Sequence, residues 1–291
     1  MRRRLAHALD RRFQALHHRL DGVAELRGEV TALRAELGAL AQRLDADLLP
    51  VLRLLAGRDT ENRRLLAAAR DDRDYELAFS EAEPLVTIVL PTFKRAELLR
   101  TRSLPAALAQ THERVEVLVI GDGPDPEAEA IVREAGDERV RWTNLPQRYV
   151  YPDADRHWLA VSTLTRNEGY RLASGRWLFD FDDDDSLPPN AVALLLETAR
   201  ERRAEAVQGV LRERHPDGST RDEVALLPDR LPLKGALVHS HLRFFERDHV
   251  ASALGIAGDW FRGERMLRAG VRIELVDQIT YDYYPSSLWA S

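Results

Sequence analysis

The sequence predicts an α/β protein with a mostly parallel sheet, helices on both of its faces, and a long helical arm in front. Three observations lead to this fold class. Buried-strand and helix patterns alternate from residue 86 onward, which is typical of parallel sheets with helical crossovers. Residues 1–49 contain no proline and repeat apolar residues at helical spacing. At 291 residues, the chain can hold one large domain or two small ones.

The expected arm covers residues 1–83, and its first part favours a coiled coil or oligomerisation segment. Apolar residues recur in alternating steps of four and three, as heptads require. Two such series are joined by a step of three where a step of four would continue the repeat. The series are Leu9, Phe13, Leu16, Leu20 and Val23, then Leu26, Val30, Leu33, Leu37, Leu40 and Leu44. A helix packed on its own domain and broken at Pro50 is the alternative. The basic start, from Arg2 to Arg19, also suits an anionic membrane surface.

The α/β domain is expected over residues 84–291. Strands are predicted where β-branched and apolar residues run together, and helices where apolar residues recur every three or four positions. In chain order, the elements are a strand at 86–90, a helix at 97–110, a strand at 115–120, a helix at 126–135, a strand at 140–143, a helix at 162–173, a strand at 176–181 and a helix at 191–200. No motif is readable in residues 208–233, where acceptor specificity is expected.

Composition excludes several classes. A net charge of −6 argues against a general nucleic-acid binder. The chain has no cysteine, which leaves neither disulfides nor thiolate metal sites. No apolar run reaches the roughly 18 residues of a spanning helix. We therefore expect a cytoplasmic protein that, if it works at a membrane, contacts the inner face peripherally.

The most informative stretch is the strand that ends in four consecutive aspartates, Asp182 to Asp185. Adjacent carboxylates repel one another, so a fold holds them together with a cation or basic partner. They follow the carboxyl end of a strand, where α/β sheets bind ligands. A solvated acidic turn is the simplest alternative. A phosphatase-type nucleophile at Asp180, with Asp182 as its acid, would be expected nearer the first strand.

A calcium loop of the EF-hand type fails on spacing. If Asp180 were position one, position six would need glycine but is Asp185, and position twelve would need glutamate but is Ala191.

Short motifs before and after the aspartates follow a recognisable order. They are Pro91-Thr92-Phe93-Lys94-Arg95, Ile120-Gly121-Asp122-Gly123, Thr165-Arg166-Asn167-Glu168-Gly169 with Ala173-Ser174-Gly175, Asp182-Asp183-Asp184, and Gly258-Asp259-Trp260 with Arg265 and Gly270. Over residues 85–270, this set resembles the family 2 glycosyltransferases of the GT-A (Rossmann-like) fold. Each motif is weak alone, and the match rests on their order and spacing.

The resemblance implies a role for each matching residue. The nucleotide-sugar contacts would be Pro91, Thr92, Asp122, Arg166, Asn167, Asp182 and Asp183. Asp182 and Asp184 would hold Mg²⁺ or Mn²⁺, and Asp259 would be the catalytic base. Two positions depart from the family pattern, because Gly121 and Gly258 stand where a first acid is common. Asp259 would therefore act alone, and the identity of the nucleotide stays open.

The chemistry of these residues agrees with that reading. Mg²⁺ and Mn²⁺ prefer oxygen ligands, with few carboxylates and substrate phosphate. A base at Asp259 would deprotonate an acceptor hydroxyl, and a single displacement inverts the anomeric centre. The expected enzyme is a hexosyltransferase that uses a glycan or lipid-linked acceptor, in cell-surface glycan or polysaccharide synthesis. Arg166 would contact phosphate or form a buried ion pair with an aspartate.

Several readings stay open. A nucleotidyltransferase would need a glycine-rich basic loop near the first strand, which Pro91–Arg95 is not. A non-catalytic oligomeric scaffold would be expected to lack Asp184 or Asp259. His239 and His241 could add a metal ligand, although a non-ligand pair is the simpler reading. Within the four aspartates, Asp183 is expected to turn away and Asp185 to cap the turn or bind a ligand hydroxyl. Candidates for stacking or closing over the site are Trp158, Trp177, Trp260 and residues 281–285.

Overall fold

The computed structural model describes residues 12, 14, 26–27, 29–44, 46, 49–149, 159–223 and 233–285. The chain divides into two compact units, Met1–Arg58 and Asp59–Ser291. The first apolar series of the expected coiled coil, most of the basic start, and Trp158 lie outside the described residues. Within the described part, no helix has both the length and the apolar character to cross a membrane.

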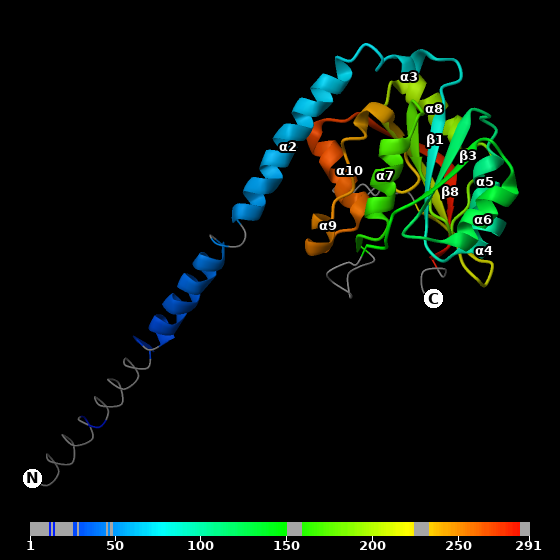
Figure 1. Ribbon diagram of the computed structural model, residues 1–291. Coiled ribbons are helices and arrows are strands. Elements are labelled where there is room, and N and C mark those ends of the chain that lie inside the picture. The colour runs from blue at the N-terminus through cyan, green and yellow to red at the C-terminus, as the bar shows by residue number, and fades with distance from the viewer. Residues whose placement is uncertain are drawn as a thin grey trace, which may run out of the picture. The chain divides into compact units, whose positions relative to one another are not determined.

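The Asp59–Ser291 unit is built around one sheet (Figure 1). Its path is β3-β2-β1-β4-β7-β5-β6, and β8 pairs with β5 off this path. The strands are β1 (Val86–Thr92), β2 (Val115–Gly121), β3 (Val140–Asn144), β4 (Trp177–Asp180), β5 (Ala206–Arg214), β6 (Thr220–Glu223), β7 (Leu237–His239) and β8 (Ile273–Tyr283). The β3-β2-β1-β4 half is parallel throughout, as predicted.

Helices cover both faces of this sheet, which confirms the predicted fold class. The helical elements of the described residues are α2 (Leu49–Arg70), α3 (Leu77–Ser80), α4 (Ala96–Leu98), the π-helix η2 (Leu99–Ser103), α5 (Leu104–Leu108), α6 (Pro126–Ala135), α7 (Thr163–Leu172), α8 (Ala191–Arg202), the 3-10 turn η4 (Ser240–Leu242), α9 (Val250–Ala253) and α10 (Gly258–Ala269). The period of two along β1 explains the layers. Ile88 packs toward α5, α6 and α8, and Val89 packs toward Tyr170 of α7.

A glycine brings α7 unusually close to the sheet. A Cβ on Gly169 would lie 2.3 Å from Val89 Cγ1 and 2.7 Å from Ile120 Cδ1. A larger residue here would push the helix away from β1 and β2. Because Arg166 and Asn167 lie on the same helix, Gly169 helps to fix the depth at which these side chains meet the sheet edge.

Pro91 lies inside β1, although proline cannot donate to a ladder. Val89 accepts from Phe181 N, just beyond the last β1–β4 pair, Val89↔Asp180. The backbone of Pro91 faces the same neighbouring strand as the backbone of Val89, but β4 ends before it reaches Pro91. No ladder bond to β4 is therefore lost, and the strand reaches Thr92 at the site.

Beyond β4 the sheet departs from the predicted parallel pattern. β7 pairs antiparallel with both β4 and β5, and β6 pairs antiparallel with β5. β8 then runs parallel to β5 with register shifts near Val210. These strands were not predicted, because β7 has only three residues and the partners lie far apart in sequence.

The compact unit begins at Asp59, before the boundary expected at residue 84. The cause is a buried polar contact. Glu205 is fully buried and pairs with Arg70 at 2.7 Å, and Tyr75 donates its hydroxyl to the same carboxylate. Tyr75 and Phe79 belong to the main core cluster. Residues 59–83 thus pack into this domain.

Candidate functional site

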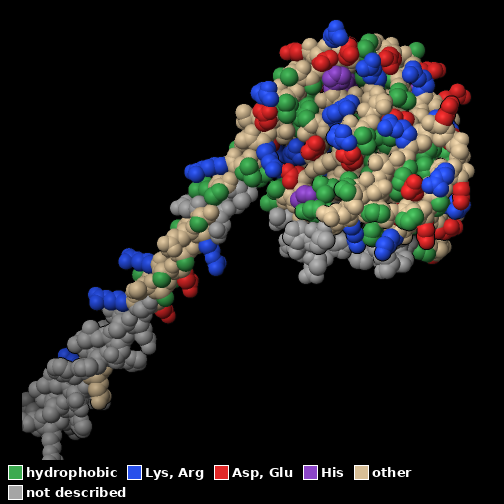
Figure 2. All heavy atoms as spheres, in the orientation of Figure 1, with side chains coloured by type: hydrophobic (Ala, Val, Ile, Leu, Met, Phe, Trp, Pro, Cys, Tyr) green, Lys and Arg blue, Asp and Glu red, His purple; other side chains and the backbone are tan. Residues whose placement is uncertain are grey.

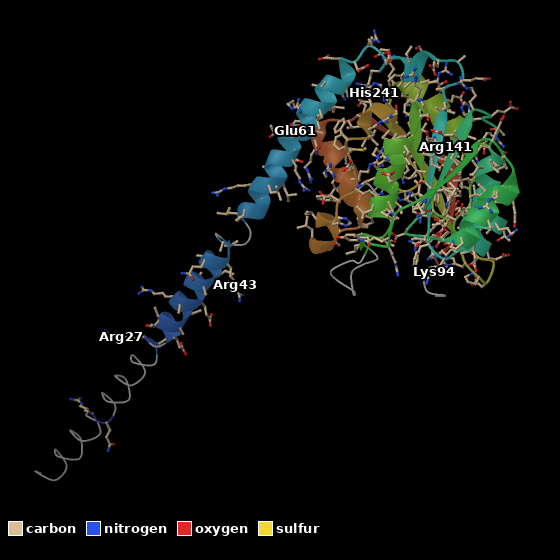
Figure 3. All side chains as sticks on the ribbon, in the orientation of Figure 1. Arg27, Arg43, Glu61, Lys94, Arg141 and His241 are labelled. Carbon is tan, nitrogen blue, oxygen red and sulfur yellow. The ribbon has the colours of Figure 1, made fainter. Side chains whose placement is uncertain are left out.

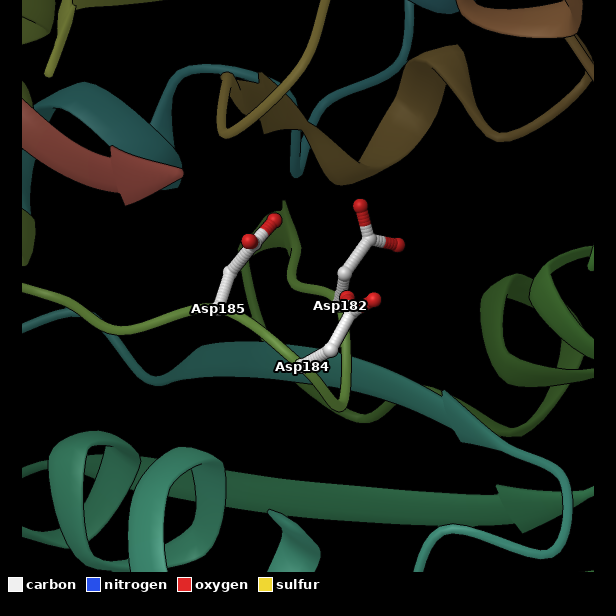
Figure 4. Close-up of side chains that lie close together, drawn as sticks. All are labelled: Asp182, Asp184 and Asp185. Atoms are coloured by element: carbon white, nitrogen blue, oxygen red, sulfur yellow. The ribbon is translucent and has the colours of Figure 1, made fainter. Parts of the chain in front are cut away.

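The site lies at the carboxyl ends of β1, β2 and β4, as the sequence predicted. The turn after β4 carries three carboxylates, Asp182, Asp184 and Asp185, whose oxygen atoms lie within 4.8 Å of one another. Figure 4 shows the three side chains gathered on this turn. We call them the carboxylate cluster. Asp185 belongs to it, and Asp183 does not.

Asp182 is held by two cations. Arg166, buried in α7, donates to Asp182 Oδ1. The Lys234 ammonium lies 3.1 Å from Asp182 Oδ2. Burial raises the pKa of the Asp182 carboxyl, but the two cations outweigh it and hold this pKa well below its usual range. Of the two roles considered for Arg166, the structure contains the ion pair.

Asp183 and Asp184 share one partner, Arg95. Its Nη1 lies 3.0 Å from Asp183 Oδ1 and 2.7 Å from Asp184 Oδ2. Thr92 Oγ1 donates to Asp183 Oδ2 at 2.8 Å. Burial raises the pKa of Asp183 to about 7, against the pull of Arg95. Asp183 thus turns toward Thr92 at the end of β1.

Asp185 is fully buried and ties the turn to β8. Its carboxylate accepts from the Tyr281 hydroxyl and from Tyr284 N, both at 2.9 Å, and Lys234 lies at 2.9 Å. Burial raises the pKa of Asp185 to about 6, although Lys234 acts in the opposite direction. The aromatic residues near the C-terminus therefore meet the site through Asp185.

Asp180 forms the centre of a buried arginine network. Its carboxylate accepts two contacts from the Tyr170 hydroxyl, at 2.8 and 2.7 Å. Arg247 lies at 3.2 Å, Arg262 at 3.1 Å and Arg166 at 3.6 Å. Burial raises the pKa of Asp180, but the arginines outweigh it and the net shift is downward. Three guanidiniums and the Tyr170 hydroxyl thus hold the Asp180 carboxylate, which argues against a role as a free nucleophile.

A cavity of ≈ 680 Å³ adjoins the carboxylate cluster. It is lined by Asp182 and Lys234 on one side and by Asp259 and Trp260 of α10 on another. Asp259 lies in the first turn of α10 and is half-buried. The structure therefore brings the expected base and the expected metal-binding turn to one cavity.

Asp122 and Asn167 contact residues outside the carboxylate cluster. Asp122, at the end of β2, is nearly buried, and Arg148 lies 3.9 Å from it; burial raises the pKa of its carboxyl. Asn167 bonds twice to the backbone of Arg247, donating to its carbonyl at 2.9 Å and accepting from its N–H at 2.8 Å. Asn167 thus positions Arg247, which lines the cavity.

The histidines lie at the other end of β4. His239 pairs with Trp177, the first residue of that strand, whereas the aspartates follow the last. In Figure 3, His241 and Lys94 lie at opposite edges of the domain, and Lys94 lies two residues after the end of β1. His239 bonds to Tyr75 O at 3.0 Å and accepts from His241 N at 3.1 Å. Both ring nitrogens are used, so His239 is a buried structural residue, as is Trp177.

Acid is expected to destabilise the domain through His239. Burial lowers the pKa of His239 to about 4. The unfolded value is near 6.5, so between these two values the unfolded chain binds more protons and stability falls as pH falls. The loss from pH 7 to pH 5 should be about 2 kcal/mol. Other buried groups titrate in this window, so urea unfolding should compare the wild type with His239→Gln. The variant should lack the part of the pH dependence that His239 causes. If the free energy of unfolding fell equally with pH in both proteins, this prediction would be wrong.

The carboxylate cluster fits a hard divalent cation. Mg²⁺ binds oxygen at about 2.1 Å, so two ligands of one ion lie up to roughly 4.2 Å apart. The oxygens of Asp182, Asp184 and Asp185 need only a small closure to reach that spacing. Asp182 and Asp184 were predicted as ligands, and the geometry adds Asp185 to the set.

Several basic residues of the site were missed in the sequence. Arg95, Arg247 and Lys234 face the aspartates, but only Arg95 stands in a motif that had been noticed. One signal was available for Lys234. The chain has 42 Lys and Arg residues, and only Lys94 and Lys234 are lysines. On the face of the molecule shown in Figure 2, acidic and basic side chains are mixed.

The order of these elements agrees with a known family. The sequence model of "Glycosyl transferase family 2" matches residues 87–252, more than half of the chain. The chain belongs to glycosyl transferase family 2. The matched residues include the β1 end, Asp122, Arg166 and the carboxylate cluster, and they end before Asp259. The resemblance drawn from the motifs is thereby confirmed.

Among curated proteins, this family 2 chain is 31% identical over 116 residues to the succinoglycan biosynthesis protein ExoO of Rhizobium meliloti, covering 40% of the chain and 30% of that protein. It is 26% identical over 121 residues to the GalNAc(5)-diNAcBac-PP-undecaprenol beta-1,3-glucosyltransferase of Campylobacter jejuni, covering 40% of the chain and 35% of that protein. The chain thus spans about a third of the length of these relatives.

Solved structures show the same fold. S. aureus TarS in complex with UDP matches with a TM-score of 0.53 at 14% identity, over 69% of this chain and 60% of that one. Its complex with UDP-GlcNAc matches equally well, at 15% identity, over 69% of this chain and 58% of that one. At such identities the likeness concerns the fold, and it supports the GT-A architecture of this family 2 domain.

Proposed function

We propose that the chain transfers a sugar from a nucleotide-sugar donor to an acceptor hydroxyl, with inversion and with Mg²⁺ or Mn²⁺. The observation that carries this proposal is the shared cavity. Asp182 of the carboxylate cluster and Asp259 of α10 line the same ≈ 680 Å³ space. A donor diphosphate beside the cluster would place its sugar toward Asp259. Asp182, Asp184 and Asp185 would hold the metal, which would stabilise charge on the departing diphosphate.

Unsatisfied arginines in the cavity support an anionic donor. Arg166 Nη1 and Arg247 Nε are buried and have no hydrogen-bond partner among the described residues. Both residues line the cavity. Buried polar groups are normally hydrogen-bonded, and charge-assisted bonds to phosphate suit a guanidinium well. Arg247 Nε could bind the diphosphate while Arg247 Nη2 keeps its ion pair to Asp180. Arg166 Nη1 lies 3.6 Å from Asp180 Oδ1 and would be shared between that carboxylate and the diphosphate.

Asp259 would act as the general base. Its carboxylate would accept the proton of an acceptor hydroxyl as that oxygen attacks the anomeric carbon from the face opposite the diphosphate. The bond to the diphosphate oxygen breaks in the same step, which inverts the configuration. Thr92, Asp122 and Asp183, at the ends of β1, β2 and β4, would contact the nucleoside. We propose a glycan or lipid-linked acceptor because the name of one relative refers to succinoglycan biosynthesis and that of another to a glycan linked to undecaprenol.

Metal removal tests the proposal directly. A panel of nucleotide sugars should yield one donor that releases nucleoside diphosphate, slowly to water and faster with acceptor. EDTA should reduce this release by at least about a hundredfold, because the leaving group then lacks the divalent cation that stabilises most of its charge. Excess Mn²⁺ or Mg²⁺ should restore it. If no donor is turned over with either metal, the proposed reaction is wrong.

We also propose that the arm forms a two-stranded coiled coil with a second copy of the chain. Leu26, Val30, Leu33, Leu37, Leu40 and Leu44 are all about half exposed, at 46–65%. Their spacing makes Glu29 a g position and Arg34 the next e position. In a parallel pair, each Glu29 would face Arg34 of the other copy, whereas an antiparallel pair would set Arg34 against Arg34.

Light scattering on the full chain should report a dimer. Leu33→Glu with Leu37→Glu should give monomers, because two buried apolar layers would become charged. Ala32→Glu with Ala35→Glu, placed on the outer face, should stay dimeric. A wild-type monomer at micromolar concentration would exclude this role for the arm.

A further inference from the structure

Lys234 holds the place of a cation within the carboxylate cluster. Its Nζ lies 3.1 Å from Asp182 Oδ2 and 2.9 Å from Asp185 Oδ2, and it bridges the two carboxylates. Both carboxylates also belong to the cluster that fits a divalent metal. An ammonium and a metal ion held between the same two carboxylates would lie close together, and two cations at such distances repel strongly. We propose that Lys234 is a tethered cation that competes with the metal and yields its place when the donor diphosphate binds.

Contacts with neighbouring residues fix the position of Lys234. Its ammonium lies 3.8 Å from the centre of the Tyr283 ring and 5.4 Å from that of Tyr281. The next residue, Gly235, has φ +63, and a Cβ there would lie 2.2 Å from the Tyr281 ring. Tyr281 itself donates to Asp185. The lysine, its aromatic contacts and one of its carboxylate partners thus form a single unit.

The residue type suits an exchangeable cation. The other cations at the cluster, Arg95 and Arg166, are planar guanidiniums that pair with the remaining oxygens of Asp184 and Asp182. Lysine instead carries a compact ammonium on four rotatable carbons. It can occupy the space of a metal ion and withdraw along its own stem. The Lys234 side chain is 21% exposed and lines the cavity, which lies next to the cluster.

Competition couples the metal to the donor. A metal that binds alone must displace an ammonium and leave it without its anionic partners. A diphosphate that arrives with the metal offers the ammonium new oxygens, so each ligand then favours the other. Couplings of this kind commonly change affinity by about 5–150-fold. This inference depends on metal use in the proposed function, and it adds an internal competitor that makes metal binding conditional on the donor.

The first test follows the ammonium itself. Because Lys94 and Lys234 are the two lysines of the chain, protein grown with ¹³Cε-lysine should give two lysine side-chain signals. Mg²⁺ with inorganic pyrophosphate should shift the Lys234 signal, and Lys94 serves as the internal reference. Mg²⁺ alone should shift it only at much higher concentration. An unmoved Lys234 signal at saturating Mg²⁺ and pyrophosphate would overturn the proposal.

The second test measures metal affinity without turnover. In Mn²⁺ titrations followed by electron paramagnetic resonance, Lys234→Met should bind Mn²⁺ about tenfold more tightly than wild type in the absence of pyrophosphate. Lys234→Gln should behave similarly, and Lys94→Met should bind as wild type does. Thermal unfolding checks that each variant is folded. If a variant does not fold, the lysine signals of the wild type still test the proposal.

The outcomes separate this inference from the proposed function. Equal Mn²⁺ affinity in wild type and Lys234→Met would refute the competition while leaving metal use intact. If Mn²⁺ binds neither protein, even with pyrophosphate, the metal dependence of the proposed function is wrong, and this inference falls with it.

Discussion

Asp259→Asn is expected to reduce sugar transfer by about 10²–10⁴-fold while the domain stays folded. Asparagine has nearly the same shape as aspartate, but its amide cannot take a proton from the acceptor hydroxyl. Asp259 is half-buried at the start of α10, where its carboxylate accepts from Trp260 N at 3.0 Å. Asparagine is tolerated at a helix start, so we expect a stability change below about 1 kcal/mol. The measurements are kcat at saturating acceptor and the thermal unfolding midpoint.

Glu264→Gln provides the matched control. Glu264 lies on the same helix, lines the same cavity and pairs with Arg268 at 3.5 Å. Its loss should leave kcat within about a factor of three, because a partly exposed helical ion pair contributes little. If Glu264→Gln lost transfer and Asp259→Asn kept it, the base would be Glu264. If both variants stayed active, the cavity would not hold the acceptor.

Asp180→Asn is expected to destabilise the domain by about 3–5 kcal/mol, the usual cost of removing one partner from a buried ion pair. The side chain of Asp180 is 4% exposed and lies among Arg166, Arg247 and Arg262. Asparagine would leave three guanidiniums close together without the carboxylate that they share. Urea unfolding at neutral pH measures the change in the free energy of unfolding.

Asp277→Asn is the control for that measurement. Asp277 is an exposed residue of β8, where removal of a charge should change stability by less than about 0.5 kcal/mol. If Asp180→Asn cost as little, water would be screening the arginine network, and Asp180 would not be needed to hold it.

The parallel half of the sheet could be read from the sequence because its signals are local. The runs at 86–90 and 115–120 are continuously buried in β1 and β2, and the helix expected at 126–135 is α6. Asp125 caps that helix by accepting from Ala128 N, and Gly136 ends it with a positive φ. Each of these features depends on a few neighbouring residues.

The other half could not be read, because its partners are distant in sequence. β5 gains its neighbours from β7, β8 and β6, and β8 follows β5 only after two other strands. Arg70 and Glu205 likewise stand far apart in the chain, and nothing near either residue announces the pair. Both the early start of the domain and the fate of His239 follow from such contacts.

The sequence by itself determined the family, the order of the motifs and the place of an acidic turn after a strand. These depend on residue types and their spacing, which survive without coordinates. Only the tertiary structure decided which partners each aspartate has, because four adjacent carboxylates look alike until the fold brings other side chains to them. Asp180 faces arginines, Asp183 faces Thr92 and Arg95, and Asp182 and Asp185 share Lys234. Charge partners come from other strands and helices, and the energy of a buried charge depends on those partners more than on its neighbours in the chain.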